Sequence, residues 1–425
     1  PMRRLLLAVL VAALPSAVSA QVVPAGARAA GLGENYGVMA RGFGAGYWNP
    51  ANLGQRGNPA FSLELPGVGL SASADPIALS DIKKYGGDTI PGSVKQKWLD
   101  AIGPNGSLEL RTAAHVTEAG LSIGPVAITS GTTIGIRGDL PHDAVATILY
   151  GNAGPSGQGD TLSFTNGALQ AFAVSHVGLS IGIPIPVHIT HAADERFSVG
   201  VTAKYVMGHG LLDARDGKGQ LTPDSASVRF VTVALYDQNN AINGTGTGFD
   251  LGAAWTSGKL SAGLTIYDLA NSFRFKDQGK VGSLHAFLSP DSSGGTSDLT
   301  TIDSATDSLK ATAGDLASNE RFFPSVRVAF GYRFSRRIQL SADFLHESTD
   351  PHALVTQKGT TVGLGAEVRF IPLIPLRAGI RFGDGATSFS VGTGLALGPL
   401  HIDGAVGRRT STGYNAAVGI TIGAW

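Results

Sequence analysis

The sequence predicts an all-β fold, namely a transmembrane antiparallel β-barrel of about 14 strands with an N-terminal segment inside its lumen. Long stretches alternate apolar and polar residues with a period of two, which places each kind on one face of a strand. The connections between these stretches alternate between short and long, as in barrels with short turns at one end. Glycine is abundant, at 59 of 425 residues, and charged residues make up only 15 %, against about 25 % in soluble domains.

The first element is a secretion signal at residues 1–20. A basic start is followed by the apolar run Leu5 to Leu14 and by small residues that end at Ala20. This run is too short to span a membrane as a helix, and its flanks are those of a signal peptide. We therefore expect cleavage near Ala20/Gln21 and exclude these residues from the fold.

Residues 21–58, which we call the plug, show no strand alternation and are expected to pack inside the barrel. The barrel itself is expected to occupy residues 59–425. Its long connections are predicted to be external loops, and they are 75–106, 138–166, 209–247 and 270–324.

The strands are predicted from their alternation. In one of them Val326, Val328 and Phe330 alternate with polar or small residues such as Arg327. The predicted spanning segments are about 61–74, 107–124, 126–137, 167–183, 197–208, 248–256, 259–269, 325–334, 337–347, 359–370, 374–383, 386–397, 400–408 and 413–425.

Three further segments between these strands need an assignment. Ser227 to Tyr236 is also strand-like, but a spanning strand there would reverse the alternation of turns and loops, so we assign it to a structured external loop. Loop 75–106 is expected to hold short helices. Loop 270–324 is rich in Ser, Thr, Asp and Gly and is predicted to be flexible and solvated.

Charged residues fall on the strand face opposite the large apolar side chains. Because a charge on the lipid face costs a few kcal/mol near the bilayer centre, this face is predicted to line the lumen. The face either guides the charged head of a ligand or forms a salt-bridged network that grips the plug. The predicted lumen residues are Lys204, Asp250, Arg327, Arg333, Asp343, Glu367, Arg369, Arg377, Arg381 and Asp403.

Two tryptophans, Trp255 and Trp425, fall at strand ends on the short-turn side. Tryptophan is enriched where a barrel meets the membrane interface. We therefore predict that both side chains belong to an interfacial aromatic belt.

Catalytic and metal chemistry is not expected. Gly120–Gly124 and Gly178–Gly182 match the Gly-x-Ser-x-Gly pattern of serine hydrolases, but both lie within predicted strands and not at the strand-to-helix turn that the chemistry needs. The group His188, His191, Asp194 and Glu195 is interpreted as a solvated connection and not as a metal site. We expect no cofactor, and the net charge of zero argues against a nucleic-acid partner.

The plug contains Trp48-Asn49-Pro50-Ala51, within a segment, 44–53, that resembles the Asn-Pro-Ala motif of the FadL-like outer-membrane proteins. Segments 197–205, 248–252 and 376–379 resemble strands of the same family, and the resemblance covers about residues 30–425. Pro50 restricts the backbone on both sides of the Asn-Pro bond. This turn is therefore expected either to gate the lumen or to anchor the plug.

The resemblance implies a fourteen-stranded barrel in the outer membrane of a Gram-negative-type bacterium. It also implies a passive channel for hydrophobic or amphipathic small molecules, gated by the plug at Trp48, Asn49, Pro50 and Ala51. The alternative is a PorV-like structural or secretion-associated barrel that binds a partner protein through its external loops. The expected partners are outer-membrane lipid, a hydrophobic ligand, the barrel-assembly machinery and, in the alternative, a secretion partner.

Overall fold

The structure is a computed structural model that describes most of residues 26–423. The predicted signal peptide (residues 1–20) and Trp425 lie outside the described residues. Within the range, the description omits residues 87, 152–153, 158–160, 188, 191, 193, 217–218, 223–224, 289–292, 349, 351, 355–358, 384–385 and 410–412.

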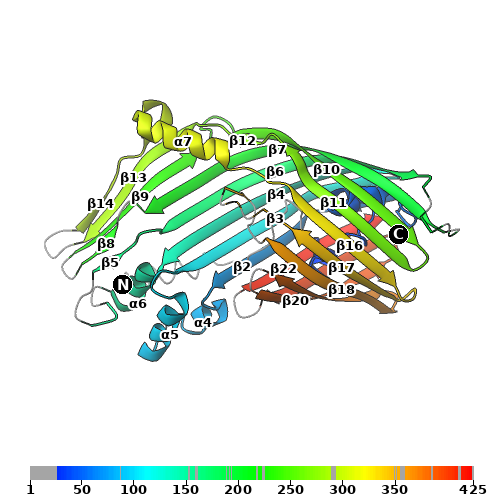
Figure 1. Cartoon of the computed structure of the whole chain (residues 1–425), viewed down its shortest axis with the longest axis horizontal. Helices are drawn as coiled ribbons and strands as arrows, with labels where there is room; N and C mark the ends of the chain where they lie inside the picture. The colour runs from blue at the N-terminus through cyan, green and yellow to red at the C-terminus, as the bar shows by residue number, and fades with distance from the viewer. Residues whose placement is uncertain are drawn as a thin grey trace.

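The chain forms a closed antiparallel barrel (Figure 1), which confirms the predicted fold class. The barrel wall has fourteen spanning strands, which we call staves because the first of them is divided into two shorter strands. The first stave consists of two strands, β1 (Phe61–Glu64) and β2 (Gly67–Asp75). The other staves follow in chain order: β3 (Ser107–Ile123), β4 (Val126–Pro141), β6 (Ala168–Ile185), β7 (Arg196–Asp216), β10 (Gly244–Ser257), β11 (Leu260–Asn271), β16 (Ser325–Arg333), β17 (Ile338–His346), β18 (Thr360–Ile371), β19 (Ile374–Gly383), β20 (Ala386–Leu397), β21 (Leu400–Arg409) and β22 (Gly413–Gly423).

The barrel closes where the first stave pairs with the last. Both β1 and β2 pair with β22 on one side and with β3 on the other. Against β22 the register moves by one residue between the pairs Glu64–Thr421 and Val68–Val418. This break falls at Pro66, which has no backbone N–H to give to the ladder.

The alternation of each strand sets its inner and outer face. On β18, Val362 and Leu364 are 46 % and 54 % exposed, whereas Gly363, Gly365 and Glu367 between and beyond them are buried. Large apolar side chains therefore face outward, toward lipid, and small or polar ones face the lumen.

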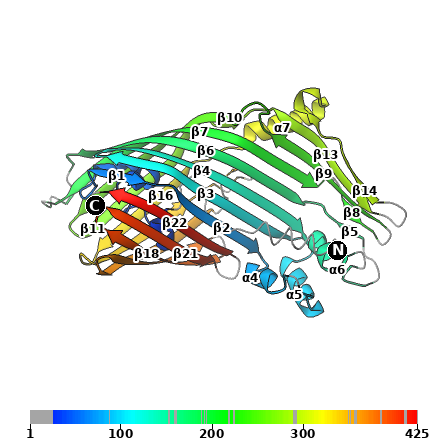
Figure 2. The same ribbon diagram turned by 180° about the vertical axis from the view of Figure 1, so that it is seen from behind.

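The two ends of the barrel differ. We call the end with the tight connections β10–β11, β16–β17, β18–β19 and β20–β21 the short-turn end, and the opposite end the long-loop end. Four strands, β3, β4, β6 and β7, have 16 to 21 residues, whereas about 9–11 residues cross a bilayer. These strands must therefore extend beyond the membrane at the long-loop end (Figures 1 and 2).

The segment from Ser227 to Tyr236, which the sequence assigns to a structured external loop, forms most of β9 (Ala226–Leu235), and this strand lies outside the ring of staves. It pairs with Leu211–Asp216, the far end of β7, and with β13 (Gly279–Leu288). β7 continues past the predicted strand end at residue 208 to Asp216, because β9 gives its outer part a partner beyond the bilayer.

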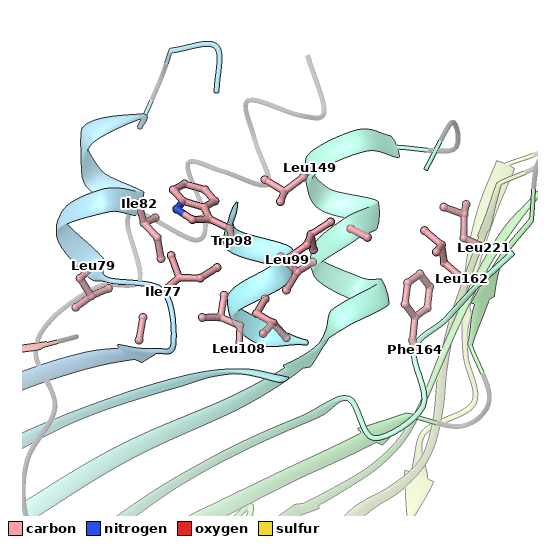
Figure 3. Packing of buried hydrophobic residues seen from close by; sticks show 14 of the residues in the cluster. Ile77, Leu79, Ile82, Trp98, Leu99, Leu108, Leu149, Leu162, Phe164 and Leu221 are labelled. Atoms are coloured by element: carbon pink, nitrogen blue, oxygen red, sulfur yellow. The ribbon is translucent and has the colours of Figure 1, made fainter. Parts of the chain in front are cut away.

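Three short helices form a cap at the long-loop end. They are α4 (Leu79–Lys84), α5 (Gly92–Ile102) and α6 (His142–Tyr150). Their apolar faces share one cluster in which Trp98, Leu99 and Leu149 are buried (Figure 3). Leu162 of β5 (Leu162–Ser163) and Leu221 of β8 (Gln220–Leu221) extend the cluster.

The prediction that 270–324 is a flexible, solvated loop is wrong for its described residues. The segment forms β12 (Arg274–Phe275), β13, β14 (Ser293–Ser297), β15 (Thr300–Thr301), η3 (Ile302–Ser304) and α7 (Asp307–Asn319). Phe273, Phe275, Leu316 and Phe322 are buried in a second cluster with the outer parts of β7 and β9. The prediction failed because it was based on the polar composition of the segment. The few apolar residues of the segment are far apart in the sequence, but they pack into one buried cluster.

The plug contributes three short helices: α2 (Ala27–Gly31), α3 (Phe43–Trp48) and the 3-10 helix η1 (Pro50–Gly54). They lie within the barrel, toward the end away from α4, α5 and α6 (Figures 1 and 2). No helix among the described residues is both long and apolar enough to cross a membrane.

Candidate functional site

The plug is almost completely enclosed. From Ala27 to Gln55 every residue is buried except Arg28 and Arg41. Its own core contains Tyr36 and Trp48, whose rings meet edge to face with centroids 5.7 Å apart. The surrounding walls come from strands on all sides of the barrel, so the plug fills the lumen at the short-turn end.

Glycines in the wall let the plug backbone approach closely. A Cβ atom at Gly379 would lie 2.2 Å from the Leu32 carbonyl carbon, and one at Gly200 would lie 2.4 Å from Ala51 N. Atoms do not approach so closely without displacement, so the plug backbone sits where these wall residues have no side chain. Gly182, Gly252 and Gly392 are further wall glycines whose Cβ position would lie 2.3–3.0 Å from plug backbone atoms.

Asn49 ties the plug to the wall between β10 and β11. Its Nδ2 donates to the carbonyl oxygens of Ala253 and Leu264, at 3.0 and 3.4 Å. Its Oδ1 accepts from Ala51 N at 3.0 Å and so caps η1, whose first residue is Pro50. Asn49, Pro50 and Ala51, three of the predicted gate residues, therefore lie together against the wall at β10 and β11.

Trp48 precedes this contact and is bound from the same side. Its carbonyl oxygen accepts hydrogen bonds from the hydroxyls of Thr265 and Tyr267, at 3.2 and 2.5 Å. The Arg327 guanidinium lies over the Trp48 ring, 4.7 Å from its centroid. The backbone and the ring of Trp48 are thus both held by the wall.

Most of the predicted lumen charges are buried and paired. Arg327 and Asp343 form an ion pair at 2.8 Å, and both side chains are at most 2 % exposed. Lys204 lies 2.7 Å from both Asp250 and Asp268. Arg377 bridges Glu367 at 2.7 Å and Asp403 at 2.6 Å. Buried charges need such partners because an isolated charge is costly to remove from water.

Several of these charges bind the plug directly. Arg28 lies 3.0 Å from Glu367, and Arg381 is paired with Glu34. Arg327 donates to the Glu34 carbonyl at 3.0 Å, and the Asp343 carboxylate accepts from Gly37 N at 3.1 Å. Arg28 and Glu34 are not among the site residues predicted from the sequence, although both are charged residues in a segment otherwise poor in charge.

Two predicted lumen arginines lie at the short-turn mouth. Arg333 is exposed, and Arg369 is half-buried and 2.9 Å from Glu367. Both line a pocket at this mouth together with Arg28 and Arg41 of the plug. They are therefore more accessible than the buried pairs deeper in the lumen.

Of the predicted interfacial tryptophans, only Trp255 lies among the described residues. Its indole N–H donates to Glu195 Oε1 at 2.7 Å. Burial by itself would raise the pKa of Glu195, but this bond and those from Thr190 and Ile189 hold the pKa down at about 2. His188 and His191 of the same connection are outside the described residues.

The two serine motifs are parts of the barrel wall. Ser122 on β3 lies 2.7 Å from the Ser62 hydroxyl, and Ser180 on β6 lies 2.8 Å from the Thr202 hydroxyl. Both are buried within strands, and the next element after each strand is again a β-strand and not a helix. Neither serine occupies the exposed strand-to-helix turn of a hydrolase nucleophile.

A small cavity remains between the plug and the wall formed by β1, β21 and β22. Its volume is about 50 Å³, and Arg28, Tyr47, Glu64 and Asp403 are among its lining residues. This is room for a few water molecules, whereas an engineered cavity that holds benzene has about 150 Å³. Glu64 is 5 % exposed, and its carboxylate has no hydrogen bond or ion pair with the described residues.

Comparison with protein families gives one match. The model described as "Family of unknown function (DUF5723)" matches residues 50–402, which is more than half of the chain. The chain belongs to the DUF5723 family. None of the curated protein sequences compared with it matches.

The DUF5723 barrel is similar in fold to several solved structures. The toluene transporter TodX of Pseudomonas putida superposes with a TM-score of 0.54 at 11 % identity, covering 96 % of this chain and 100 % of that one. The toluene transporter TbuX of Ralstonia pickettii gives 0.50 at 14 % identity, with 95 % and 99 % covered. A FadL homologue of Pseudomonas aeruginosa gives 0.50 at 11 % identity, with 96 % and 100 % covered.

At these identities the likeness shows the fold alone. It confirms the FadL-like barrel predicted from the Asn-Pro-Ala segment and the strand pattern. This DUF5723 protein therefore combines a FadL-type outer-membrane barrel fold with a plug enclosed at the short-turn end.

Proposed function

We propose that this protein is an outer-membrane channel through which small hydrophobic or amphipathic molecules pass without an energy source. The observation that carries this proposal is a lumen closed by a separate segment, the plug, and not by the wall itself. The proteins named as toluene transporters share the fold, which supports cargo of this class. In this proposal the short-turn end faces the periplasm, as in other outer-membrane barrels.

The plug acts as the gate in this proposal. The cavity beside it, of about 50 Å³, is smaller than the roughly 150 Å³ that holds a benzene molecule. Cargo therefore passes only when the plug shifts. Such a shift exchanges the hydrogen bonds of Asn49 and the ion pairs of Arg28 and Glu34 for contacts with water.

Deletion of residues 21–48 tests the gate. If the plug gates the channel, toluene and small solutes enter proteoliposomes faster with the truncated protein than with the full chain. The barrel should still assemble, which heat-dependent migration in detergent gels reports. If the deletion lowers thermal stability and leaves permeability unchanged, the plug only braces the barrel and the channel proposal fails.

The second candidate function is a PorV-like barrel that binds a partner protein. It is favoured by the ordered long-loop end, where β9, β13 and α7 form structure beyond the bilayer. Deleting the plug would leave partner capture intact in this case. A loss of capture on removal of residues 307–319, without any change in solute flux, would favour this candidate.

A further inference from the structure

The short-turn mouth holds a pocket of about 260 Å³ that is dominated by arginine. The plug supplies Arg28, Arg41 and Arg56. The barrel supplies four more from the β16–β17 connection and β18, namely Arg333, Arg336, Arg337 and Arg369. Among the described lining residues Glu367 is the one carboxylate, so these residues give the pocket a large excess of positive charge.

The carboxylate of Glu367 is already fully engaged. It pairs with Arg28 at 3.0 Å, with Arg369 at 2.9 Å and with Arg377 at 2.7 Å. Three guanidinium groups thus share this carboxylate, and Arg377 has Asp403 as a second carboxylate partner. Glu367 cannot neutralise the remaining arginines of the pocket.

Five of the arginines have no acidic partner among the described residues. Arg41 donates to the carbonyl oxygens of Val38 and Ala40, at 2.9 and 2.8 Å, and to no carboxylate. The side chains of the other four form no ion pair with any described residue. These are Arg56, Arg333, Arg336 and Arg337.

The arginines of this cluster come from the plug and from the barrel and line one pocket, which distinguishes them from scattered surface charges. Arg28 and Arg41 are the two residues between Ala27 and Gln55 that are not buried, and both reach this pocket. Residues far apart in the chain therefore direct like charges toward one space. Like charges repel one another, and an anion between them would remove that repulsion.

We propose that this pocket binds a small phosphate-type anion, which joins the plug to the barrel. The planar fork of arginine matches the oxygens of phosphate, and several forks can share one phosphate group. A volume of about 260 Å³ is below the roughly 300–1,000 Å³ of pockets for drug-sized ligands. It suits free phosphate or the head of a phosphate monoester that arrives from the short-turn side.

Binding to the detergent-purified full chain tests the proposal. Calorimetric titration with inorganic phosphate should give one site per chain, and dodecyl phosphate tests whether a lipid-like monoester binds in its place. Arg333→Gln and Arg336→Gln should each weaken binding about tenfold, as expected for one lost charge-assisted hydrogen bond. Both residues are exposed, so these variants should fold.

Arg408→Gln is the matched control because Arg408 is an exposed arginine at the long-loop end of β21. It should bind phosphate like the unmodified chain. Equal binding by all variants, equal weakening in the control, or no binding of either phosphate compound would overturn the proposal. Binding of a polyglutamate peptide and not of phosphate would replace the small anion with an acidic protein partner and would also overturn it.

Hydrogen exchange tests the bridge between plug and barrel. At a phosphate concentration near the Kd of the unmodified chain, phosphate should slow amide exchange in residues 27–48, and this protection should be much smaller in Arg336→Gln. Phosphate binding that leaves plug exchange unchanged would show that the anion does not join the two parts. This outcome is independent of whether the channel conducts.

Discussion

At the scale of single residues, the lumen contains buried ion pairs in which each charge is stabilised by its partner. Arg327 illustrates this, since it pairs with Asp343, donates to the Glu34 carbonyl and lies over the Trp48 ring. One wall side chain therefore holds a carboxylate, a plug carbonyl and a plug ring in place. Removing such a residue leaves the partner charge buried and alone.

Replacing Arg327 should strongly destabilise the protein. Arg327→Met leaves Asp343 unpaired, and we expect a loss of about 3–5 kcal/mol in the free energy of unfolding. Urea unfolding in detergent or lipid measures it. Arg327→Met combined with Asp343→Leu should recover part of the loss, because no lone charge remains. A loss below about 1 kcal/mol in the single variant would contradict the importance of the pair.

The carboxylate of Glu195 should give the β6–β7 connection a distinct pH dependence. Its pKa of about 2 lies below the usual 4.5, so its stabilising contribution is complete above pH 4.5 and is lost as the pH falls toward 2. Trp255 fluorescence should therefore change with a midpoint near pH 2, and Glu195→Gln should abolish the change. A midpoint near 4.5 would show that the hydrogen bonds to Trp255 and Thr190 do not form.

At the scale of elements, the plug is fitted to the wall by backbone contact as well as by charge. Its turns lie against wall glycines, so two main chains approach where side chains would normally separate them. Gly200 and Gly252 receive η1, and Gly379 receives the turn after α2. The high glycine content that marks the sequence as barrel-like therefore also accommodates the plug.

A pair of glycine variants tests this fit. The Cβ of Gly379→Ala would lie 2.2 Å from the Leu32 carbonyl carbon, whereas that of Gly404→Ala meets nothing within 4 Å. Gly379→Ala should displace the plug and increase solute entry into proteoliposomes, with lower thermal stability. Gly404→Ala should match the unmodified chain in both measurements. Similar behaviour of the two variants would contradict the steric role of the wall glycines.

At the scale of the whole molecule, separate cores stabilise the two ends. The cluster around Trp98 and Leu99 stabilises the cap at the long-loop end, and a distinct cluster around Tyr36 and Trp48 lies in the plug. No residue belongs to both clusters. The cap at the long-loop end and the plug are therefore expected to unfold independently.

Trp98→Ala should loosen only the long-loop end. Truncating a buried tryptophan costs about 3–5 kcal/mol, and we expect faster amide exchange in α4, α5 and α6. Exchange in residues 27–55 should stay as in the unmodified chain. Leu373→Ala, at an exposed position in the β18–β19 turn, serves as the control. Faster exchange in the plug of Trp98→Ala would show that the two ends are coupled.

The number of staves, their order along the chain and the face that each strand turns to lipid could be predicted from the sequence. These features follow from local rules, because the alternation of a strand and the tight turn that ends it can both be recognised within a window of about ten residues. Val326 and Val328 alternate with Arg327 in the sequence, and the structure keeps Arg327 buried. The Asn-Pro-Ala segment also indicated the barrel type, which the fold comparison confirms.

The pairing of the charges and the structure of the long loops could not be predicted from the sequence, because they depend on tertiary contacts. Arg28 and Glu367 are 339 residues apart, and no local pattern connects them. Phe273 and Phe322 pack together although a polar segment separates them. The arginines of the mouth likewise come from the plug and from distant strands, and barrel closure brings them to one pocket. Such contacts depend on how the whole chain closes, so they are absent from any window of the sequence.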